Sequence, residues 1–278
     1  MTDKNRLHDD AMDMLLQTSR TFYIPISRLS GRLQGAVAAA YLCMRAIDEI
    51  EDHPLLSSET KIHLLRAISQ KLTTHGQDME FTTIFEPYKS QLAEVTLRLA
   101  DWIKLIPPSA VPNVSSSTAI MASGMADWVE KNWSIQSEMD LDQYTYYVAG
   151  LVGVLLSDLW KWYDGTETDR DQAIAFGRGL QAVNIIRNRQ EDFERGVNYF
   201  PPGWDYKEMF SYARKNLALA DTYSNGLKAG QIYTFCKIPL LLAYATLQAI
   251  ETGQDKLTRQ DVISIVDQLD KEETQKQN

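Results

Sequence analysis

The chain has 278 residues, of which 44% are hydrophobic, and it carries a formal net charge of −9 at pH 7. This acidic balance argues against nucleic acid as a partner, because binding a phosphate backbone needs a concentrated basic face. No linker rich in Pro, Gly or Ser divides the chain and its length suits one hydrophobic core, so we predict a single domain over residues 1–278.

Helical periodicity runs through nearly the whole sequence, and no window shows the sustained alternation that is typical of strands. In chain order, the predicted helices cover residues 5–18, 30–52, 58–74, 86–104, 116–134, 141–163, 169–193, 206–227, 230–252 and 258–271. Residues 107–117 are expected to form a loop, and Pro239 should kink the ninth helix or mark its first turn. The predicted fold class is all-α, a bundle of about ten helices around a central hydrophobic cavity.

The second predicted helix ends in the acidic stretch DEIED, residues 48–52. Asp48 and Asp52 are four residues apart, so they lie on one helix face, one turn apart, and Arg45 shares that face. Two carboxylates this close repel each other, and a divalent cation between them removes that cost. The helix before them is small and apolar on nearly every side, which favours an interior metal site over the alternative of a solvated surface pair.

A second stretch, NIIRNRQED at residues 184–192, repeats this arrangement. It places Asn188 and Asp192 four residues apart beside Arg187. Two oxygen clusters with guanidinium groups can clamp Mg²⁺ ions and a diphosphate, because Mg²⁺ is usually shared between carboxylates and substrate phosphates. An ordinary solvated helix face is again the alternative.

Small residues interrupt the apolar run of the helix predicted over residues 141–163. Gly150 and Gly153, with Ala149, are expected to leave room in the core for a long hydrocarbon guest below a polar mouth. The alternative is close packing of helices through the same glycines.

Cys43 and Cys236 lie in apolar helical runs and are expected to be reduced, buried thiols. The N-terminus is charged and the longest apolar runs are shorter than a membrane span, so neither a secretory signal nor a spanning helix is expected.

Five motifs occur in the order found in squalene and phytoene synthases, and they resemble the squalene synthase branch most closely. They are TSRTF (18–22), YLCMRAIDEIED (41–52), YTYYVAGLVG (144–153), QAVNIIRNRQED (181–192) and YTFCKIPLLLAYATL (233–247). The resemblance implies the isoprenoid synthase fold, Mg²⁺ dependence, and head-to-head (1'-1) joining of two farnesyl diphosphates through presqualene diphosphate. The expected product is squalene or a related C30 compound, and the use of NADPH is left open.

The resemblance also implies roles by position. Ligands of the metal and diphosphate are implied at Asp48, Asp52, Asn184, Asn188 and Asp192. Diphosphate contacts are implied at Ser19, Arg20, Arg45 and Arg187. Proton removal during cyclopropane closure is implied at Tyr144, and Tyr41 and Tyr147 lie near it in the pattern. Gln181 matches a polar residue close to the reacting carbons. Walls of the prenyl channels are implied at Phe22, Val148, Ala149, Val152, Leu156, Phe235, Cys236 and Pro239.

The chain departs from the family pattern at Asn188, where the second motif normally carries Asp. An amide can coordinate through its oxygen but has no negative charge. We therefore predict weaker binding of one Mg²⁺ and an altered outcome, such as arrest at presqualene diphosphate or release of a single-substrate product.

The C-terminal KEETQKQN has none of the hydrophobic anchor of membrane-attached members. We expect a cytoplasmic monomer or weak dimer, with at most peripheral membrane contact for product release. One alternative is a single-substrate prenyl diphosphate phosphatase or terpene cyclase that gives farnesol or another C15 product. Another is a non-catalytic isoprenoid-binding bundle.

Overall fold

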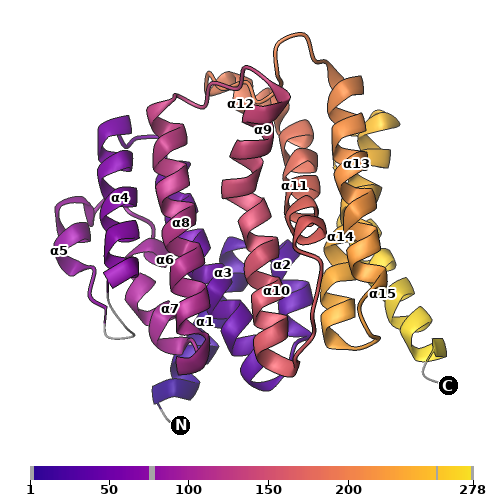
Figure 1. The fold of residues 1–278 in the computed structure, drawn as a ribbon, viewed down its shortest axis with the longest axis horizontal. Coiled ribbons are helices and arrows are strands. Elements are labelled where there is room, and N and C mark those ends of the chain that lie inside the picture. The colour runs from indigo at the N-terminus through magenta and orange to yellow at the C-terminus, as the bar shows by residue number, and fades with distance from the viewer. Residues whose placement is uncertain (1–2, 75–78, 255, 277–278) are drawn as a thin grey trace. The chain divides into compact units, whose positions relative to one another are not determined.

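The computed structural model describes residues 3–74, 79–254 and 256–276, without the side chains of residues 3, 4, 20 and 272–276. Within these ranges every regular element is helical, which confirms the all-α fold class (Figure 1). The chain forms two compact units, one of Met1–Trp133 with Leu155–Gly165 and one of Ser134–Val154 with Thr166–Asn278. The division falls inside helix α10 (Leu151–Asp164). A single domain stays a prediction.

The first unit is built around α3 (Gly31–Glu51). Residues 36–40 and 42–44 of this helix are buried, and most of them are small, so neighbouring helices approach it closely. Its neighbours in the unit are α1 (Asp3–Thr18), α2 (Arg20–Ser27), α4 (Ser58–Thr74), α6 (Glu94–Leu97), α7 (Leu99–Leu105) and α8 (Val111–Glu130). The short elements α5 (Thr82–Phe85), η1 (Glu86–Tyr88) and η2 (Pro108–Ala110) connect them.

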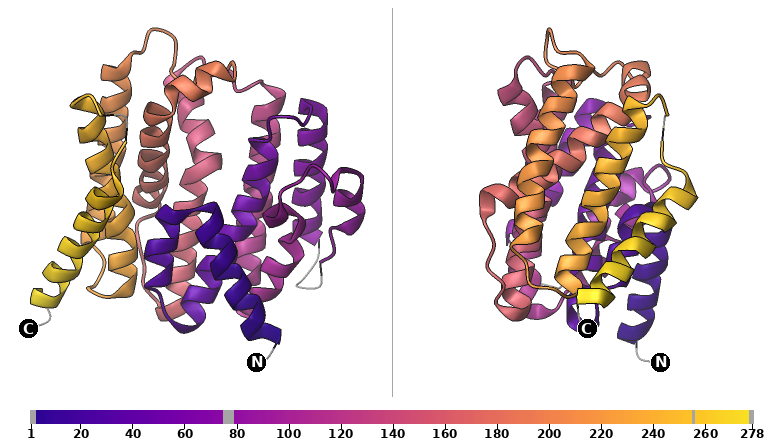
Figure 2. Two further views of the ribbon diagram at one scale, coloured as in Figure 1. Left: turned by 180° about the vertical axis from the view of Figure 1, so that it is seen from behind. Right: turned by 90° about the vertical axis from the view of Figure 1, so that its right-hand side faces the viewer.

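The second unit is built around α11 (Arg170–Arg187), which packs against α9 (Glu138–Thr145), α13 (Tyr206–Asn225), α14 (Gln231–Glu251) and the π-helical turn η3 (Tyr146–Gly150). The short α12 (Arg189–Glu194) follows α11, and α15 (Arg259–Lys276) packs on α14. The right-hand view of Figure 2 shows α13, α14 and α15 side by side.

Glycines bring the start of α10 against α11. A Cβ atom at Gly153 would lie 2.0 Å from the carbonyl oxygen of Ala173, and one at Gly177 would lie 2.1 Å from the carbonyl oxygen of Ala149. Such distances are far inside van der Waals contact, so the two backbones touch directly. Close helix packing is therefore confirmed for Gly153, and the expectation that this glycine leaves room for a guest is wrong. The central cavity stays a prediction.

Two predicted elements of the first unit are wrong. The helix predicted over residues 86–104 is divided into η1, α6 and α7, because contacts distant in sequence use its backbone and side chains. The ring of His53 bonds the Gln91 carbonyl at 3.0 Å, and the Thr96 hydroxyl donates to the Ala46 carbonyl at 2.8 Å. The loop predicted over residues 107–117 is shorter than expected, because α8 already begins at Val111. Pro112 lies in the first turn of α8, where the backbone N–H that proline lacks would have no helical partner.

The helix α14 is long and apolar enough to cross a membrane by length and composition alone. However, 72% of its most apolar window is buried inside the structure, as is typical of a core helix. Pro239 lies inside α14, beyond its first turn.

Candidate active site

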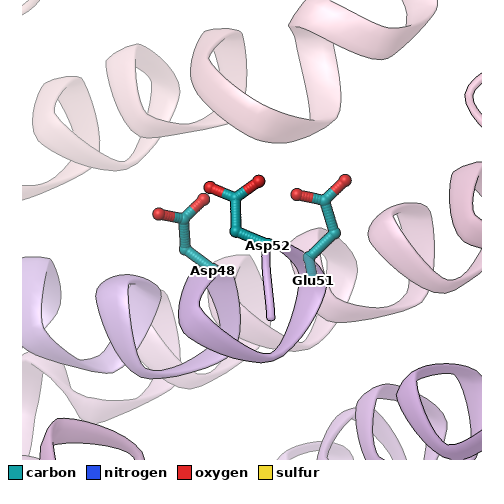
Figure 3. A group of neighbouring side chains, drawn as sticks. All are labelled: Asp48, Glu51 and Asp52. Carbon is teal, nitrogen blue, oxygen red and sulfur yellow. The ribbon is translucent and has the colours of Figure 1, made fainter. Parts of the chain in front are cut away.

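The acidic end of α3 gathers three carboxylates, those of Asp48, Glu51 and Asp52, which we call the first cluster. One oxygen from each residue lies within 4.8 Å of the other two. Figure 3 shows the three side chains pointing to the same side of the end of the helix. The clustering follows from helix geometry, because positions 48, 51 and 52 are three and four residues apart and share one face.

Burial and mutual repulsion make this cluster costly when it is fully charged. Burial, with the negative charge of Asp52 added, raises the pKa of Asp48 to about 7. The same two causes raise the pKa of Glu51 to about 8, although Glu51 accepts a hydrogen bond from the Trp133 indole. A divalent cation would relieve this repulsion, and three oxygens in reach of one point are a suitable ligand set for Mg²⁺. The first cluster therefore fits a metal site.

The remaining side chains predicted in this unit lie on α2 and α3. Arg45 pairs with Asp48 and Glu49, and its buried Nε has no hydrogen-bond partner among the described residues. Burial raises the pKa of Tyr41, although a hydrogen bond with Ser19 acts in the opposite direction. The ring of Phe22 lies 5.4 Å from that of Tyr41 between centroids. Arg20 begins α2, but its side chain lies outside the described part of the structure.

The second acidic motif follows the end of α11. We call Asn184, Asn188 and Asp192, with Arg187 and Arg195, the second cluster. The helix predicted over residues 169–193 is interrupted at Asn188, which ends α11 and precedes α12. Even so, the Asn188 amide bonds the Asn184 carbonyl at 2.8 Å and the Asp192 amide bonds the Asn188 carbonyl at 2.9 Å. The three motif residues therefore stay one turn apart.

Guanidinium groups contact two oxygens of this second cluster. Arg195 Nη2 lies 2.5 Å from Asp192 Oδ1, and Asp192 is only 6% exposed. Arg187 Nε donates to Asn188 Oδ1 at 3.1 Å. Among the described residues, Asp192 joins no group of three carboxylate, His or Cys side chains close enough to share an ion. The motif residues of the second cluster therefore supply one carboxylate and two amide groups, against three carboxylates in the first cluster.

Tyr144 is buried at the end of α9, next to the π-helical turn. Its hydroxyl donates to the hydroxyl of Tyr199 at 3.1 Å, and the two rings stack with centroids 4.7 Å apart. Gln181 accepts a hydrogen bond from Asn184 at 3.5 Å. Turns of this π-helical kind occur frequently at functional sites.

The predicted channel residues fall into two groups by exposure. Phe22, Tyr147, Val148, Ala149, Val152 and Leu156 are partly exposed, while Phe235, Cys236 and Pro239 are buried. The first group has surface that a ligand can reach. The second group is core in this structure, and its role as channel wall stays a prediction.

The structure brings three residues to these sites that the sequence reasoning did not select. Glu51 is three residues after Asp48, and Arg195 is three residues after Asp192, so helical spacing could have found both. Tyr199 lies outside any helix, in a segment without periodicity, and only its contact with Tyr144 identifies it.

Comparison with known proteins gives one consistent family. The family model described as squalene/phytoene synthase matches residues 15–204. Squalene synthase of Eremothecium gossypii is 31% identical over 284 residues, which cover 90% of this chain and 63% of that protein. Squalene synthase of Homo sapiens is 30% identical over 287 residues, covering 86% of this chain and 63% of that protein. The chain thus spans less than two thirds of the length of these curated relatives.

Solved structures share the fold. A complex of TcSQS with the ligand E5700 superposes with a TM-score of 0.78 at 23% identity, covering 95% of this chain and 86% of that one. A dehydrosqualene synthase in complex with a ligand gives a TM-score of 0.64 at 17% identity, covering 97% of both chains.

Proposed function

The chain belongs to the squalene/phytoene synthase family, and on that premise we propose that it is a prenyltransferase that joins two farnesyl diphosphates head to head (1'-1). Presqualene diphosphate is the intermediate, and squalene or a related C30 compound is the product. The observation that carries this proposal is the first cluster, three carboxylates within 4.8 Å at the end of a buried helix.

Loss of diphosphate from an allylic carbon leaves a carbocation, so the enzyme must stabilise the leaving group and keep water away. Asp48, Glu51 and Asp52 would hold Mg²⁺, which when bound neutralises charge on the diphosphate oxygens. Arg45 adds a guanidinium group that remains charged at any physiological pH. Its buried Nε has no hydrogen-bond partner among the described residues.

Ring closure to the cyclopropane requires loss of a proton, and we assign its acceptor to the hydroxyl oxygen of Tyr144. The hydrogen bond and ring stacking with Tyr199 fix the direction of this hydroxyl. The aromatic faces of Phe22 and Tyr41 would stabilise positive charge on the prenyl chain. Gln181 would position polar groups near the reacting carbons.

The prenyl chains are assigned to the partly exposed apolar side chains Val148, Ala149, Val152 and Leu156, with Tyr147 beside them. If NADPH reduces the intermediate, the product is squalene. Without reduction the product is dehydrosqualene or a related C30 hydrocarbon or alcohol. We further assign the protein to the cytoplasm, with peripheral membrane contact for release of this apolar product.

The test is incubation of the purified full chain with farnesyl diphosphate and Mg²⁺, with and without NADPH. Mass spectrometry then follows both the hexane extract and the aqueous diphosphates. A C30 product, or presqualene diphosphate in the aqueous phase, is expected in Mg²⁺ and not in EDTA. Farnesol or another C15 compound alone would replace the proposal with a single-substrate enzyme.

A further inference from the structure

Glu51 of the first cluster is held by two residues that the proposed chemistry does not use. The indole Nε1 of Trp133 donates a hydrogen bond to Glu51 Oε1, and Lys61 Nζ donates to the main-chain carbonyl of Glu51 at 2.7 Å. The Lys61 ammonium also lies 5.3 Å from the centroid of the Trp133 ring. Glu51 and Lys61 are buried, Trp133 is half-buried, and all three residues belong to the first unit.

The backbone of Trp133 adopts a conformation that tryptophan rarely takes. Asn132 and Trp133 have φ angles of 50° and 49°, in the left-handed region where glycine is favoured. The Trp133 amide bonds the Trp128 carbonyl at 2.9 Å, a helix ending that needs one left-handed residue, usually glycine. Trp133 is a second such residue, and a bulky one. Strained backbone of this kind clusters at functional sites, and here it carries the indole that contacts Glu51.

The indole bond restrains a side chain that a metal ion would otherwise have to order. A glutamate side chain loses rotamer freedom when its carboxylate is fixed. An indole N–H can only donate, so it holds Oε1 as an acceptor and uses one of about four lone-pair sites of the carboxylate. The same carboxylate can still bind a cation, and one of its oxygens lies within 4.8 Å of oxygens of Asp48 and Asp52.

Lys61 holds the main chain of the same residue. The Glu51 carbonyl is one of the last four of α3, which have no partner within the helix, and the ammonium of Lys61 on α4 supplies one. The contact of this ammonium with the Trp133 ring is a cation–π interaction, which ties the orientation of the ring to α4. Backbone, carboxylate and indole are therefore linked in one arrangement.

We propose that Trp133 is a positioning residue for the metal site at the first cluster, that it acts through Glu51, and that Lys61 holds both in place. The metal at this cluster rests on the proposed function. Partners that orient a metal ligand typically contribute about ten- to 100-fold to metal affinity. Loss of the indole donor should therefore weaken metal binding although Trp133 itself is not a ligand.

The test measures Mn²⁺ binding to the substrate-free full chain by electron paramagnetic resonance, with Mn²⁺ in place of Mg²⁺. Trp133→Phe keeps an aromatic ring, removes the donor and should weaken Mn²⁺ binding about tenfold. Trp162→Phe is the matched control and should bind Mn²⁺ as the wild type does. Trp162 is another half-buried tryptophan of the first unit, whose indole donates to Ser109 Oγ at 2.8 Å and whose ring lies 4.9 Å from the Arg32 guanidinium carbon.

A double-variant cycle separates positioning through Glu51 from a general weakening of the fold. In a Glu51→Ala background, Trp133→Phe should cause no further loss of Mn²⁺ affinity, because the side chain that it orients is absent. Circular dichroism confirms that each variant is folded. Equal Mn²⁺ affinity of the wild type and Trp133→Phe, a further tenfold loss in the double variant, or absence of Mn²⁺ binding by the wild type would each overturn the proposal.

The cycle does not require turnover. A protein that shows the expected Mn²⁺ affinities but makes no C30 product would refute the proposed function and leave this inference standing. Formation of a C30 product together with wild-type Mn²⁺ affinity in Trp133→Phe would do the reverse.

Discussion

The first and second clusters begin from the same four-residue spacing of oxygens and differ in what surrounds those oxygens. In the first, Asp48, Glu51 and Asp52 meet within 4.8 Å and burial raises the pKa of Asp48 to about 7. In the second, Asp192 is paired with Arg195 and the middle position is an amide. Spacing therefore predicts that oxygens lie one turn apart, whereas the charged groups around those oxygens differ between the two clusters.

Removing the first cluster should have the largest effect. Asp48→Asn/Asp52→Asn is expected to lower C30 formation about 100-fold or more, because leaving-group stabilisation is lost. Product formation per minute at saturating Mg²⁺ is the measurement. The control is Asp127→Asn/Glu130→Gln, which neutralises two exposed carboxylates paired with Arg66 at 2.9 and 3.0 Å. Undiminished turnover by the first double variant would show that the first cluster is not the metal site.

Removing the hydroxyl of Tyr144, the proposed proton acceptor in the second unit, should have an effect of similar order. Tyr144→Phe is expected to lower the rate of presqualene diphosphate formation about 100-fold, as for other acid–base groups. Tyr199→Phe removes only the partner hydroxyl, so it should lower kcat by a smaller factor and leave KM unchanged. Single-turnover kinetics measures both. A larger loss with Tyr199→Phe than with Tyr144→Phe would reverse the two roles.

Packing offers a comparison of the two units that is independent of catalysis. Gly153→Ala is expected to destabilise the protein by about 3 kcal/mol, because its Cβ would lie 2.0 Å from a backbone oxygen of α11. Gly35→Ala in α3 should instead leave stability unchanged or raise it by about 0.5 kcal/mol, since its Cβ meets no described atom within 4 Å. Urea unfolding of both variants gives the two free energies, and equal values would contradict the close contact at Gly153.

Asn188→Asp makes the second cluster more like the first. It is expected to lower the Mg²⁺ concentration for half-maximal activity about tenfold, because a negatively charged carboxylate replaces a neutral amide at this position. Asn198→Asp adds the same charge in the nearby loop and keeps the oxygen that accepts from the Phe200 amide at 3.1 Å. An unchanged metal titration with Asn188→Asp would show that the charge at this position is irrelevant.

The thiols of Cys43 and Cys236 should be equally unreactive in the two units. Burial raises the pKa of Cys43 in the first unit and of Cys236 in the second, so both remain protonated. Neither is expected to react with iodoacetamide at pH 8 in the folded protein, and both should react in urea. Rapid labelling of one thiol in the native protein, followed by mass spectrometry, would reveal an opening in that unit.

The sequence predicted the features that depend on residues close together in the chain. The helix α3 and the acidic spacing at its end follow from an apolar run and from helix geometry, and both occur as predicted. The helix predicted over residues 86–104 is broken because the His53 ring bonds a carbonyl that an unbroken helix would use itself. The charge of the second cluster depends on the pairing of Arg195 with Asp192, and the role of Tyr199 depends on a contact between distant residues. Helical spacing could have found Arg195, whereas no periodic pattern points to Tyr199.

The central claim is tested most directly by Mg²⁺ activation curves of two variants that each remove one carboxylate, Glu51→Gln and Asp192→Asn. The Mg²⁺ concentration for half-maximal activity should rise about tenfold with Glu51→Gln, because a ligand of the first cluster is lost. It should stay at the wild-type value with Asp192→Asn, whose carboxylate is paired with Arg195. Equal shifts in the two variants would contradict the proposal that the first cluster, and not Asp192, dominates the Mg²⁺ dependence.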